Sequence, residues 1–353
     1  MSELLLTTCD SGGGHLLAAG IGDRVMTFVR RLAEGPIPAS GPPERFFTDR
    51  RALYEAEGLP FEDWWFDVEP KGVPSRKIRV WSGLPDLARQ FDQVTFWIDP
   101  DPNAQLTLIQ LLDWIGHIPE ILPKLRLKQS EERLGARNPG NWFMPPVPIT
   151  IKDVGLASRA WAAFRTSTPQ AWAALLNEDL GRLPGLRNAV LGMLDELPDA
   201  SGLGAGARRI LRLTERYEWW DKIEARGEAV DYPFKDKDRP ATALLQRVGQ
   251  VSTRMAPGFW EFGQTMCALG TAHMPALAGI TETSFDLAMH DDETRRRTFM
   301  ESPVTLTEFG RRVRDGAANW SQHNPVHRWW GGTRLTGSSL WRWNGATQRL
   351  LEP

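Results

Sequence analysis

The order of apolar and polar residues divides the chain into a first part, in which strands and helices alternate, and a later, mainly helical part. The most informative stretch is 91–114, where the apolar run from Val94 to Ile98 leads through a polar turn into an almost wholly apolar helix. A run of this length predicts a strand buried on both faces, as in a parallel sheet flanked by helices. We therefore take this stretch as the centre of the first domain.

Shorter patterns before this stretch predict the rest of the first domain. Strands are predicted at 4–9, 24–28 and 78–81, and helices at 16–19, 46–58 and 85–90, while residues 64–66 are assigned to a loop. This alternation is typical of an α/β layer with a parallel sheet. Residues 1–128 are thus predicted to form one α/β domain.

Glycine and proline residues mark the end of this domain, and residues 129–150 are predicted to be a linker that its prolines stiffen. A helical region follows at 151–200, with helices at 154–164, 170–177 and 186–197. Residues 201–353 are predicted to form a further domain, with helices at 207–217, 239–251, 259–269 and 306–316 and a small antiparallel meander at 333–351. Helices followed by a β-wing predict a winged-helix-like C-terminal part.

Composition and charge narrow the class of protein. The net charge of −2 excludes a globally basic nucleic-acid binder, and two cysteines, Cys9 and Cys267, are too few for a disulfide framework or a cysteine zinc site. The sixteen tryptophans are predicted mostly to fill cores. The N-terminus lacks a basic leader, and no apolar run approaches membrane-spanning length. We therefore expect a cytoplasmic protein with no membrane partner.

Polar residues follow the central strand at the point where it ends. Asp99, Asp101 and Gln105 come after this strand, and Asp10 follows the first strand. Because open α/β sheets bind ligands at the carboxyl ends of their strands, these residues predict a binding site there. Carboxylates at this edge are suited to Mg²⁺ or to a general base, which makes Asp10 and Asp99 candidate catalytic residues, although the sequence selects no metal or cofactor. Asp101 has an alternative role as the N-cap of the helix that begins at Pro102.

The turn after the first strand carries a serine and three glycines: Ser11, Gly12, Gly13 and Gly14. Glycines after a strand let backbone amides approach an anion at a helix start, so this turn is a candidate phosphate or carboxylate site, with a plain tight turn as the alternative. Ser11 is also a candidate nucleophile, which needs a histidine base. Near the next loop, Arg30 and Arg31 are either ligands for an acidic group or a solvated charge pair.

Several short motifs occur in a specific order along the whole chain. They are Asp10-Ser11, Glu34-Gly35-Pro36, Trp97-Ile98-Asp99-Pro100-Asp101, Ala160-Trp161-Ala162-Ala163-Phe164-Arg165, Trp330-Gly331-Gly332 and Trp341-Arg342-Trp343. In this order they resemble bacterial proteins that carry domain of unknown function 1835. The resemblance implies a Rossmann-like N-terminal domain whose function is unassigned.

The chain departs from that family's pattern at the candidate site. Asp10, Ser11, Asp99, Asp101 and Gln105 match or nearly match the pattern. The family's imidazole and two of its carboxylates correspond here to other residues, namely Arg30, Pro100 and Ala104. These losses keep a non-catalytic protein among the hypotheses.

The C-terminal region combines arginine with tryptophan. Residues 295–349 contain ten arginines, three acidic residues and five tryptophans. On a winged helix this composition predicts nucleic-acid binding, with a charged face over a tryptophan-filled core as the alternative. His323 and His327 have the spacing of helical metal ligands, but Pro325 between them disfavours a helix.

Three hypotheses of function follow from these patterns. The first, which we favour, is a small anionic or nucleotide-like ligand bound at the strand ends of the N-terminal domain, with or without catalysis. The second is a ligand-sensing regulator that binds DNA through its C-terminal region. The third is a non-catalytic partner protein.

Overall fold

The computed structural model describes residues 1–8, 10–59, 64–68, 74–77, 83–130, 145–224, 241–245 and 258–353, and for 10–11, 64–68, 74–77 and 217–224 it describes the backbone alone. The chain divides into two compact units. The first comprises Met1–Leu194 with the later segment Arg328–Arg334, and the second comprises Asp195–His327 with Leu335–Pro353. Among the described residues, no helix combines the length and apolar character needed to cross a bilayer.

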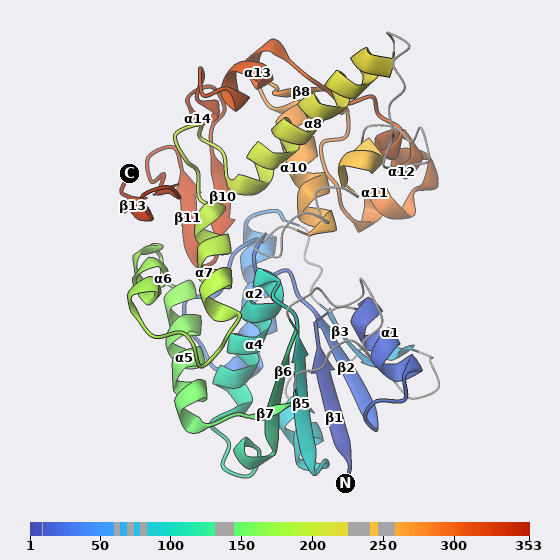
Figure 1. The fold of residues 1–353 in the computed structure, drawn as a ribbon, viewed down its shortest axis with the longest axis vertical. Coiled ribbons are helices and arrows are strands. Elements are labelled where there is room, and N and C mark those ends of the chain that lie inside the picture. The colour runs from blue at the N-terminus through green and yellow to red at the C-terminus, as the bar shows by residue number, and fades with distance from the viewer. Residues whose placement is uncertain are drawn as a thin grey trace. The chain divides into compact units, whose positions relative to one another are not determined.

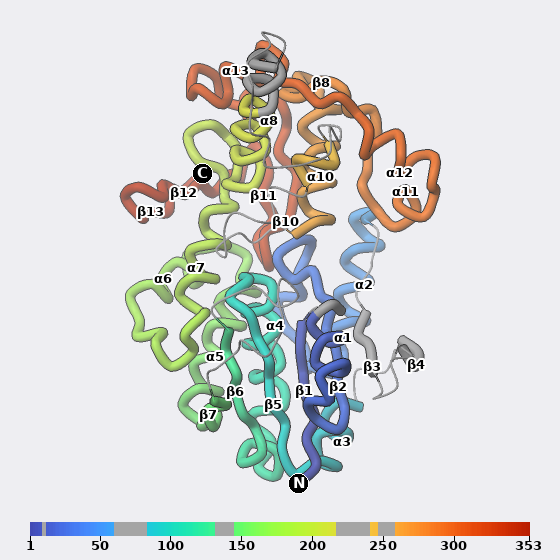
Figure 2. The backbone as a smooth tube through the Cα atoms, turned by 45° about the vertical axis from the view of Figure 1, so that its right-hand side comes forward, coloured from blue at the N-terminus to red at the C-terminus, as the bar shows by residue number. Residues whose placement is uncertain are grey.

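The first unit is built on a seven-stranded sheet with the order β4-β3-β2-β1-β5-β6-β7 (Figures 1 and 2). The four central strands, β2, β1, β5 and β6, are parallel, and β3, β4 and β7 are antiparallel to their neighbours. The strand bounds are β1 Glu3–Thr7, β2 Arg24–Val29, β3 Trp64–Val68, β4 Pro74–Lys77, β5 Gln93–Ile98, β6 Leu125–Gln129 and β7 Val147–Pro148. The predicted α/β class with a mostly parallel sheet is therefore confirmed.

Helices cover this sheet and join its strands. They are α1 Asp10–Ala18, α2 Phe46–Ala56, α3 Gly83–Arg89 and α4 Pro102–Ile115, and two 3₁₀ turns lie at Pro43–Arg45 and Leu122–Lys124. In α4 every residue except Asn103 and Asp113 is buried, because the helix lies between the sheet and α5 (Ile151–Phe164; Figure 1). A helix enclosed on opposite sides has little solvated face, which explains why α4 is mostly apolar and why its buried polar residues Gln105, Thr107 and Gln110 are hydrogen-bonded.

The helical part of the first unit consists of α5, α6 (Gln170–Ala174), a 3₁₀ turn at Leu175–Asn177, and α7 (Leu186–Asp195), whose last residue belongs to the second unit. Thr150 and Asp153 form a capping box at the start of α5. Phe164 from α5 and Trp172 from α6 pack with their ring centres 5.0 Å apart. The predicted helices at 154–164, 170–177 and 186–197 are confirmed, with ends shifted by a few residues.

The second unit contains further helices and short strand pairs. Its elements are α8 Ala205–Glu224, α10 Phe259–Thr271, α11 Leu287–Asp291, α12 Glu293–Met300, α13 Glu308–Arg314, α14 Trp320–His323, the pair β8 Leu277–Ala278 and β9 Thr305–Leu306, and the pair β12 Arg342–Asn344 and β13 Arg349–Leu351. Residues 241–245 are also helical. Ile210 and Leu211 of α8 pack in one core with Phe262 and Met266 of α10. The second half of the chain is thus helical with small strand pairs.

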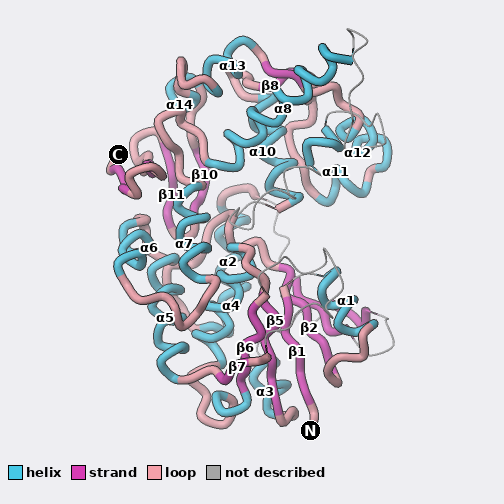
Figure 3. Tube along the Cα trace, in the orientation of Figure 1, coloured by secondary structure: helices cyan, strands magenta, loops and turns pink. Residues whose placement is uncertain are grey.

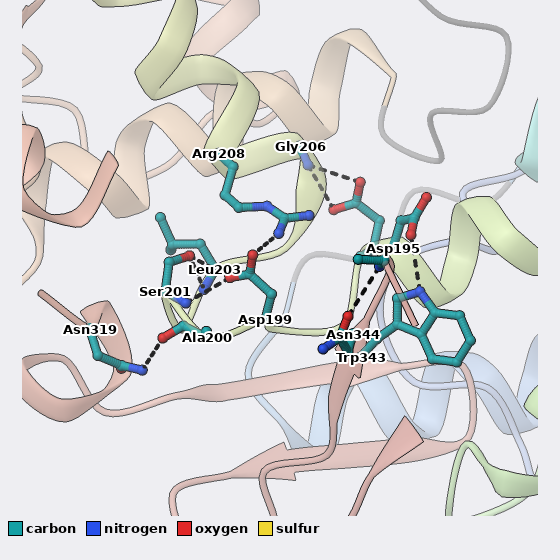
Figure 4. Close-up of polar contacts among 12 residues, drawn as sticks. Asp195, Asp199, Ala200, Ser201, Leu203, Gly206, Arg208, Asn319, Trp343 and Asn344 are labelled. Atoms are coloured by element: carbon teal, nitrogen blue, oxygen red, sulfur yellow. Dashed lines mark hydrogen bonds and ion pairs between the residues drawn. The ribbon is translucent and has the colours of Figure 1, made fainter. Parts of the chain in front are cut away.

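Polar contacts fix the loop between α7 and α8 to the C-terminal strands (Figure 4). The indole Nε1 of Trp343 donates to Asp195 Oδ1 at 3.1 Å, and its backbone N–H donates to Pro198 O at 2.9 Å. Gly206 N–H, in the first turn of α8, donates to the nearly buried carboxylate of Glu196. The protein's own carboxylate therefore occupies the anion-binding start of α8.

Three local predictions are wrong. The glycine turn is helical from Asp10 onward, because the close packing of Gly13 against Thr27 outweighs the low helix propensity of glycine. Residues 64–66 lie in β3 instead of a loop, since their aromatic side chains favour a strand and the outer edge of β2 offers a partner. The single meander at 333–351 is two separate pairs, in which β11 (Thr333–Thr336) joins β10 (His327–Trp330) and β12 joins β13 (Figure 3).

Some predictions fall partly or wholly outside the described residues. The predicted strand at 78–81 lies outside them, and so does most of the helix at 239–251. Of the predicted linker, Val147–Pro148 forms the edge strand β7, while residues 131–144 are outside the description.

Candidate functional site

The order of the parallel strands creates a switch point at the carboxyl ends of β1 and β5. The chain passes from β1 to β2 on one side, and β5 then returns to the other side of β1. The connections that leave β1 and β5 therefore diverge, and in open α/β sheets ligands bind in the crevice at such a point. The connections that leave these two strands contain the residues predicted for the site, Asp10–Gly14 and Asp99–Gln105.

Two threonines lie side by side at this edge. Thr7, the last residue of β1, pairs with Thr27 of β2 in the sheet register, and both side chains are 0% exposed. Neither hydroxyl has a hydrogen-bond partner within the described part of the chain. Unsatisfied buried hydroxyls are costly, so this pair at the switch point calls for a physical explanation, such as an ordered water or a bound ion.

Helix α1 approaches the threonine pair closely through Gly13. A Cβ atom added to Gly13 would overlap Thr27 Oγ1 and lie 3.7 Å from Thr7 Cγ2. Gly12 and Gly13 are buried, whereas Gly14 is exposed. Because α1 begins at Asp10, its N-terminal amides and the positive end of its dipole lie at the same edge as the two hydroxyls.

We expect Gly13→Ala to destabilise the protein by about 1–3 kcal/mol, because the new methyl group must displace α1 or rotate Thr27. Gly14→Ala is the matched control, since its added Cβ meets nothing within 4 Å. It should be neutral or stabilising by up to about 1 kcal/mol through helix propensity. Urea unfolding of both variants measures the difference. Equal free energies of unfolding would contradict the close approach of α1 to Thr27.

Asp99 and Asp101 have different environments after β5. Asp99 is 5% exposed, and its Oδ1 accepts a hydrogen bond from Asp101 N–H at 3.0 Å. Asp101 is the N-cap of α4, because its Oδ1 accepts from Asn103 N–H at 2.9 Å and Pro102 is the first helical residue. The alternative role predicted for Asp101 is confirmed, and Asp99 is the carboxylate held directly at the strand end.

Gln105 stabilises the turn that follows β5. Its side chain is buried, and its Nε2 donates to Asp99 O at 2.7 Å and to Gln129 Oε1 at 3.1 Å. A Cβ added to Gly185 would overlap this amide, so the turn before α7 closes over it. The Oε1 atom has no hydrogen-bond partner among the described residues. Gln105 therefore holds the end of β5 against β6, and a ligand contact by its amide stays a prediction.

The two arginines predicted to bind an acidic ligand lie elsewhere. Arg30 continues the side of β2 that carries Phe28, opposite to Thr27, and its guanidinium carbon lies 4.9 Å and 4.7 Å from the ring centres of Phe28 and Phe47. Its Nη1 donates to Gln110 Oε1 at 2.5 Å. Arg31 forms an ion pair with Glu34 at 2.9 Å. The structure thus brings neither arginine to the threonine pair.

The remaining predicted residues are placed by their backbone alone. Asp10 and Ser11 open α1 at the switch point, and their side chains lie outside the description, as does Cys9. Their predicted roles as base and nucleophile therefore stay predictions. Cys267, in the second unit, is buried, and burial raises the pKa of its thiol to about 12. This thiol stays protonated near neutral pH and is not suited to nucleophilic chemistry.

Sequence reasoning missed Thr7, Thr27 and Lys128. The two threonines had a usable signal, because each follows at least two apolar residues within its strand and both stand near the strand end. Lys128 lies on β6 opposite Trp97, with its Nζ 4.0 Å from the centre of a Trp97 ring. Burial lowers the pKa of this ammonium, and the negative charge of Glu3 acts in the opposite direction. Lys128 adds a positive charge near the carboxyl end of the sheet.

The described contacts of the arginine- and tryptophan-rich C-terminal region are mainly burial of its tryptophans and ion pairs of its arginines. Trp320, Trp341 and Trp343 are buried in the second unit, so they do not present exposed rings for base stacking. Several arginines in this region are paired with carboxylates, as in Arg295 with Glu282 and Arg314 with Glu215. The structure favours the alternative of a charged face over a tryptophan-filled core.

No cluster of three or more metal-binding side chains occurs among the residues whose side chains are described. His323 is exposed and packs edge-on against Phe309, with ring centres 5.1 Å apart. The His323 and His327 pair therefore has no third described ligand with which to bind zinc.

No protein-family model matches the chain, and no curated protein matches it. The resemblance to proteins with domain of unknown function 1835 therefore stays a prediction.

Proposed function

We propose that the first unit is a Rossmann-like domain that binds a small anionic or nucleotide-like molecule at the carboxyl ends of β1 and β5. The observation that carries this proposal is the pair of buried hydroxyls on Thr7 and Thr27, which have no partner in the described chain and face the first turns of α1. Hydroxyl donors beside helix N-terminal amides form a preorganised set of donors for a phosphate or carboxylate group.

Asp99 is the group we propose for any proton transfer at this site. The register of β1 and β5 puts Trp97 at the level of Thr7, so Asp99 comes two residues beyond that level, on the same side of the sheet. A carboxylate beside a bound ligand can accept a proton from it, provided that the two are within hydrogen-bond reach. Asp99 has this role only if the ligand is a substrate. The threonine pair supports binding of a ligand, not catalysis.

The first test asks whether the protein carries a ligand. Native mass spectrometry of the protein purified from its host, compared with a denatured spectrum, measures the mass of any retained molecule. Inorganic phosphate, AMP and ATP are then added separately in thermal unfolding experiments. We expect a retained anion or a rise in melting temperature with at least one probe. No retained mass and no shift with any probe would count against the proposal.

The decisive variant is Thr27→Val, which replaces one buried hydroxyl by a methyl group of similar size. Because this hydroxyl has no described partner, the ligand-free protein should keep its stability or gain up to about 1 kcal/mol. Loss of one hydrogen bond should weaken binding of the active probe by about 2- to 12-fold. The measurement is the probe's dissociation constant, by calorimetry.

Thr95→Val is the matched control, because Thr95 is a buried threonine whose Oγ1 donates to Glu3 Oε1 at 2.5 Å, away from the switch point. We expect it to lose stability while its affinity for the probe is unchanged. Equal affinities in Thr27→Val and the unaltered protein would place the ligand away from the threonine pair.

The regulator hypothesis has less support. A winged-helix arrangement of the C-terminal part stays a prediction, its Trp320, Trp341 and Trp343 are buried, and its Arg295 and Arg314 pair with carboxylates of the protein. We therefore assign the second unit no nucleic-acid partner in this proposal.

A further inference from the structure

A short C-terminal segment belongs to the first unit. Residues 328–334, which we call the inserted segment, are part of that unit, whereas the residues on both sides of them belong to the second unit. The inserted segment bonds to the end of α5, where Gly332 N–H donates to Phe164 O at 3.0 Å and Thr333 Oγ1 donates to Thr166 O at 3.2 Å. It is therefore a structural part of the first unit and not a loop on its surface.

The turn of the inserted segment leaves no room for a side chain at Gly331 or Gly332. Gly331 has a positive φ of 55°, and a Cβ added there would lie 2.5 Å from Phe164 O. A Cβ added to Gly332 would overlap Arg165 O. Two backbones thus approach so closely that any larger residue at 332 must separate them.

The inserted segment also holds the loop that follows β2. This loop, residues 30–38, is called the β2 loop below. Its Ile37 N–H donates to Gly331 O at 3.1 Å. Beside it, Arg165 Nε donates to Pro38 O at 2.6 Å. One end of the β2 loop is therefore fixed by the inserted segment and by the end of α5.

The other end of the β2 loop is fixed to the strand-end turn, residues 99–103. Asn103 accepts from Ala33 N–H at 3.1 Å through Oδ1 and donates to Arg30 O through Nδ2. The backbone N–H of Asn103 donates to Asp101, and that of Asp101 donates to Asp99. Hydrogen bonds at the two ends of the β2 loop, joined by the backbone of that loop, thus form a series from the inserted segment to the strand-end turn.

From this series we infer that the inserted segment is a positioning device for the strand-end turn. When the segment is docked, it orders the β2 loop, and the β2 loop holds Asn103 and with it the turn that carries Asp99. When the segment is displaced, the β2 loop and the strand-end turn lose order. This coupling does not depend on which ligand the site binds. Amide exchange of the backbone is enough to measure it. Coupling between the two places must be reciprocal.

Hydrogen–deuterium exchange of the full-length chain tests the inference. Gly332→Ala displaces the inserted segment, and Gly337→Ala is the control, because its added Cβ meets nothing within 4 Å. In Gly332→Ala we expect amide exchange in peptides covering 31–38 and 99–103 to be at least about five-fold faster, with β1 and the amino-terminal half of β5 unchanged. Gly337→Ala should match the unaltered protein. Faster exchange in 328–334 with no change in 99–103 would overturn the inference.

The reverse experiment starts from the other end. Asn103→Ala removes both contacts to the β2 loop, and we expect it to speed exchange in peptides covering 328–334 by a similar factor. The control is Gln90→Ala at an exposed position. Unchanged exchange in 328–334 would also overturn the inference. If Gly332→Ala does not fold, Thr333→Val, which loses only the bond to Thr166 O, replaces it with the same two readouts.

Discussion

Replacing Trp330 by alanine is expected to lower the free energy of unfolding by about 3–5 kcal/mol. Its side chain is 2% exposed, with ring centres 5.5 Å from Phe164 and 6.5 Å from Trp172. Its Nε1 donates to Met193 O at 2.7 Å. The alanine variant therefore leaves a cavity between three helices and an unpaired carbonyl on α7, and both effects destabilise the first unit.

Two further variants separate these effects. Trp330→Phe keeps an aromatic ring but loses the bond to Met193, so it should cost less than the alanine variant. Trp329→Ala is the neighbouring control, because Trp329 is only half-buried and should cost clearly less than Trp330. Urea unfolding measures all three. Similar losses for Trp329→Ala and Trp330→Ala would mean that Trp330 is not a core residue of the first unit.

Trp330 also marks a limit of sequence reasoning. The composition predicts that most tryptophans fill cores, and Trp330 does so. No local pattern indicates that its partners are Phe164 and Trp172, because hydrophobic periodicity identifies a buried face and not the distant element that covers it. The same holds for Gly331 and Gly332, whose need for glycine is visible only where they approach α5.

Features set by neighbouring residues were predictable. The run from Val94 to Ile98 is buried throughout, and Asp101 with Pro102 starts α4 as the N-cap and first helical residue. Each depends on residues only a few positions apart. The placement of Arg30 was not predictable in this way, since one step along β2 decides which side of the sheet a residue faces. The pairing of Thr7 with Thr27 depends on the register of two strands.

Arg50 gives the second large expected effect. Its side chain is fully buried, and its guanidinium donates to three backbone carbonyls of the β2 loop: to Pro36 O at 3.2 Å, Arg31 O at 2.8 Å and Glu34 O at 2.9 Å. Arg50→Ala should lower the free energy of unfolding by about 3 kcal/mol, because the carbonyls of Arg31 and Pro36 lose their bond to the guanidinium and each such loss costs about 1–3 kcal/mol, whereas Glu34 O keeps a bond from the Tyr54 hydroxyl. Chemical denaturation measures the loss.

Arg45→Ala is the control for Arg50→Ala, because Arg45 is exposed at the start of the same helix and forms only an i,i+4 pair with Asp49. It should cost at most about 0.5 kcal/mol. Arg50→Lys should fall between the two, since an ammonium restores the charge but cannot reproduce the planar fork that reaches three carbonyls. A loss in Arg50→Ala no larger than in Arg45→Ala would mean that the β2 loop keeps its shape without this guanidinium. Contacts other than those of the β2 loop would then have to hold the strand-end turn in place.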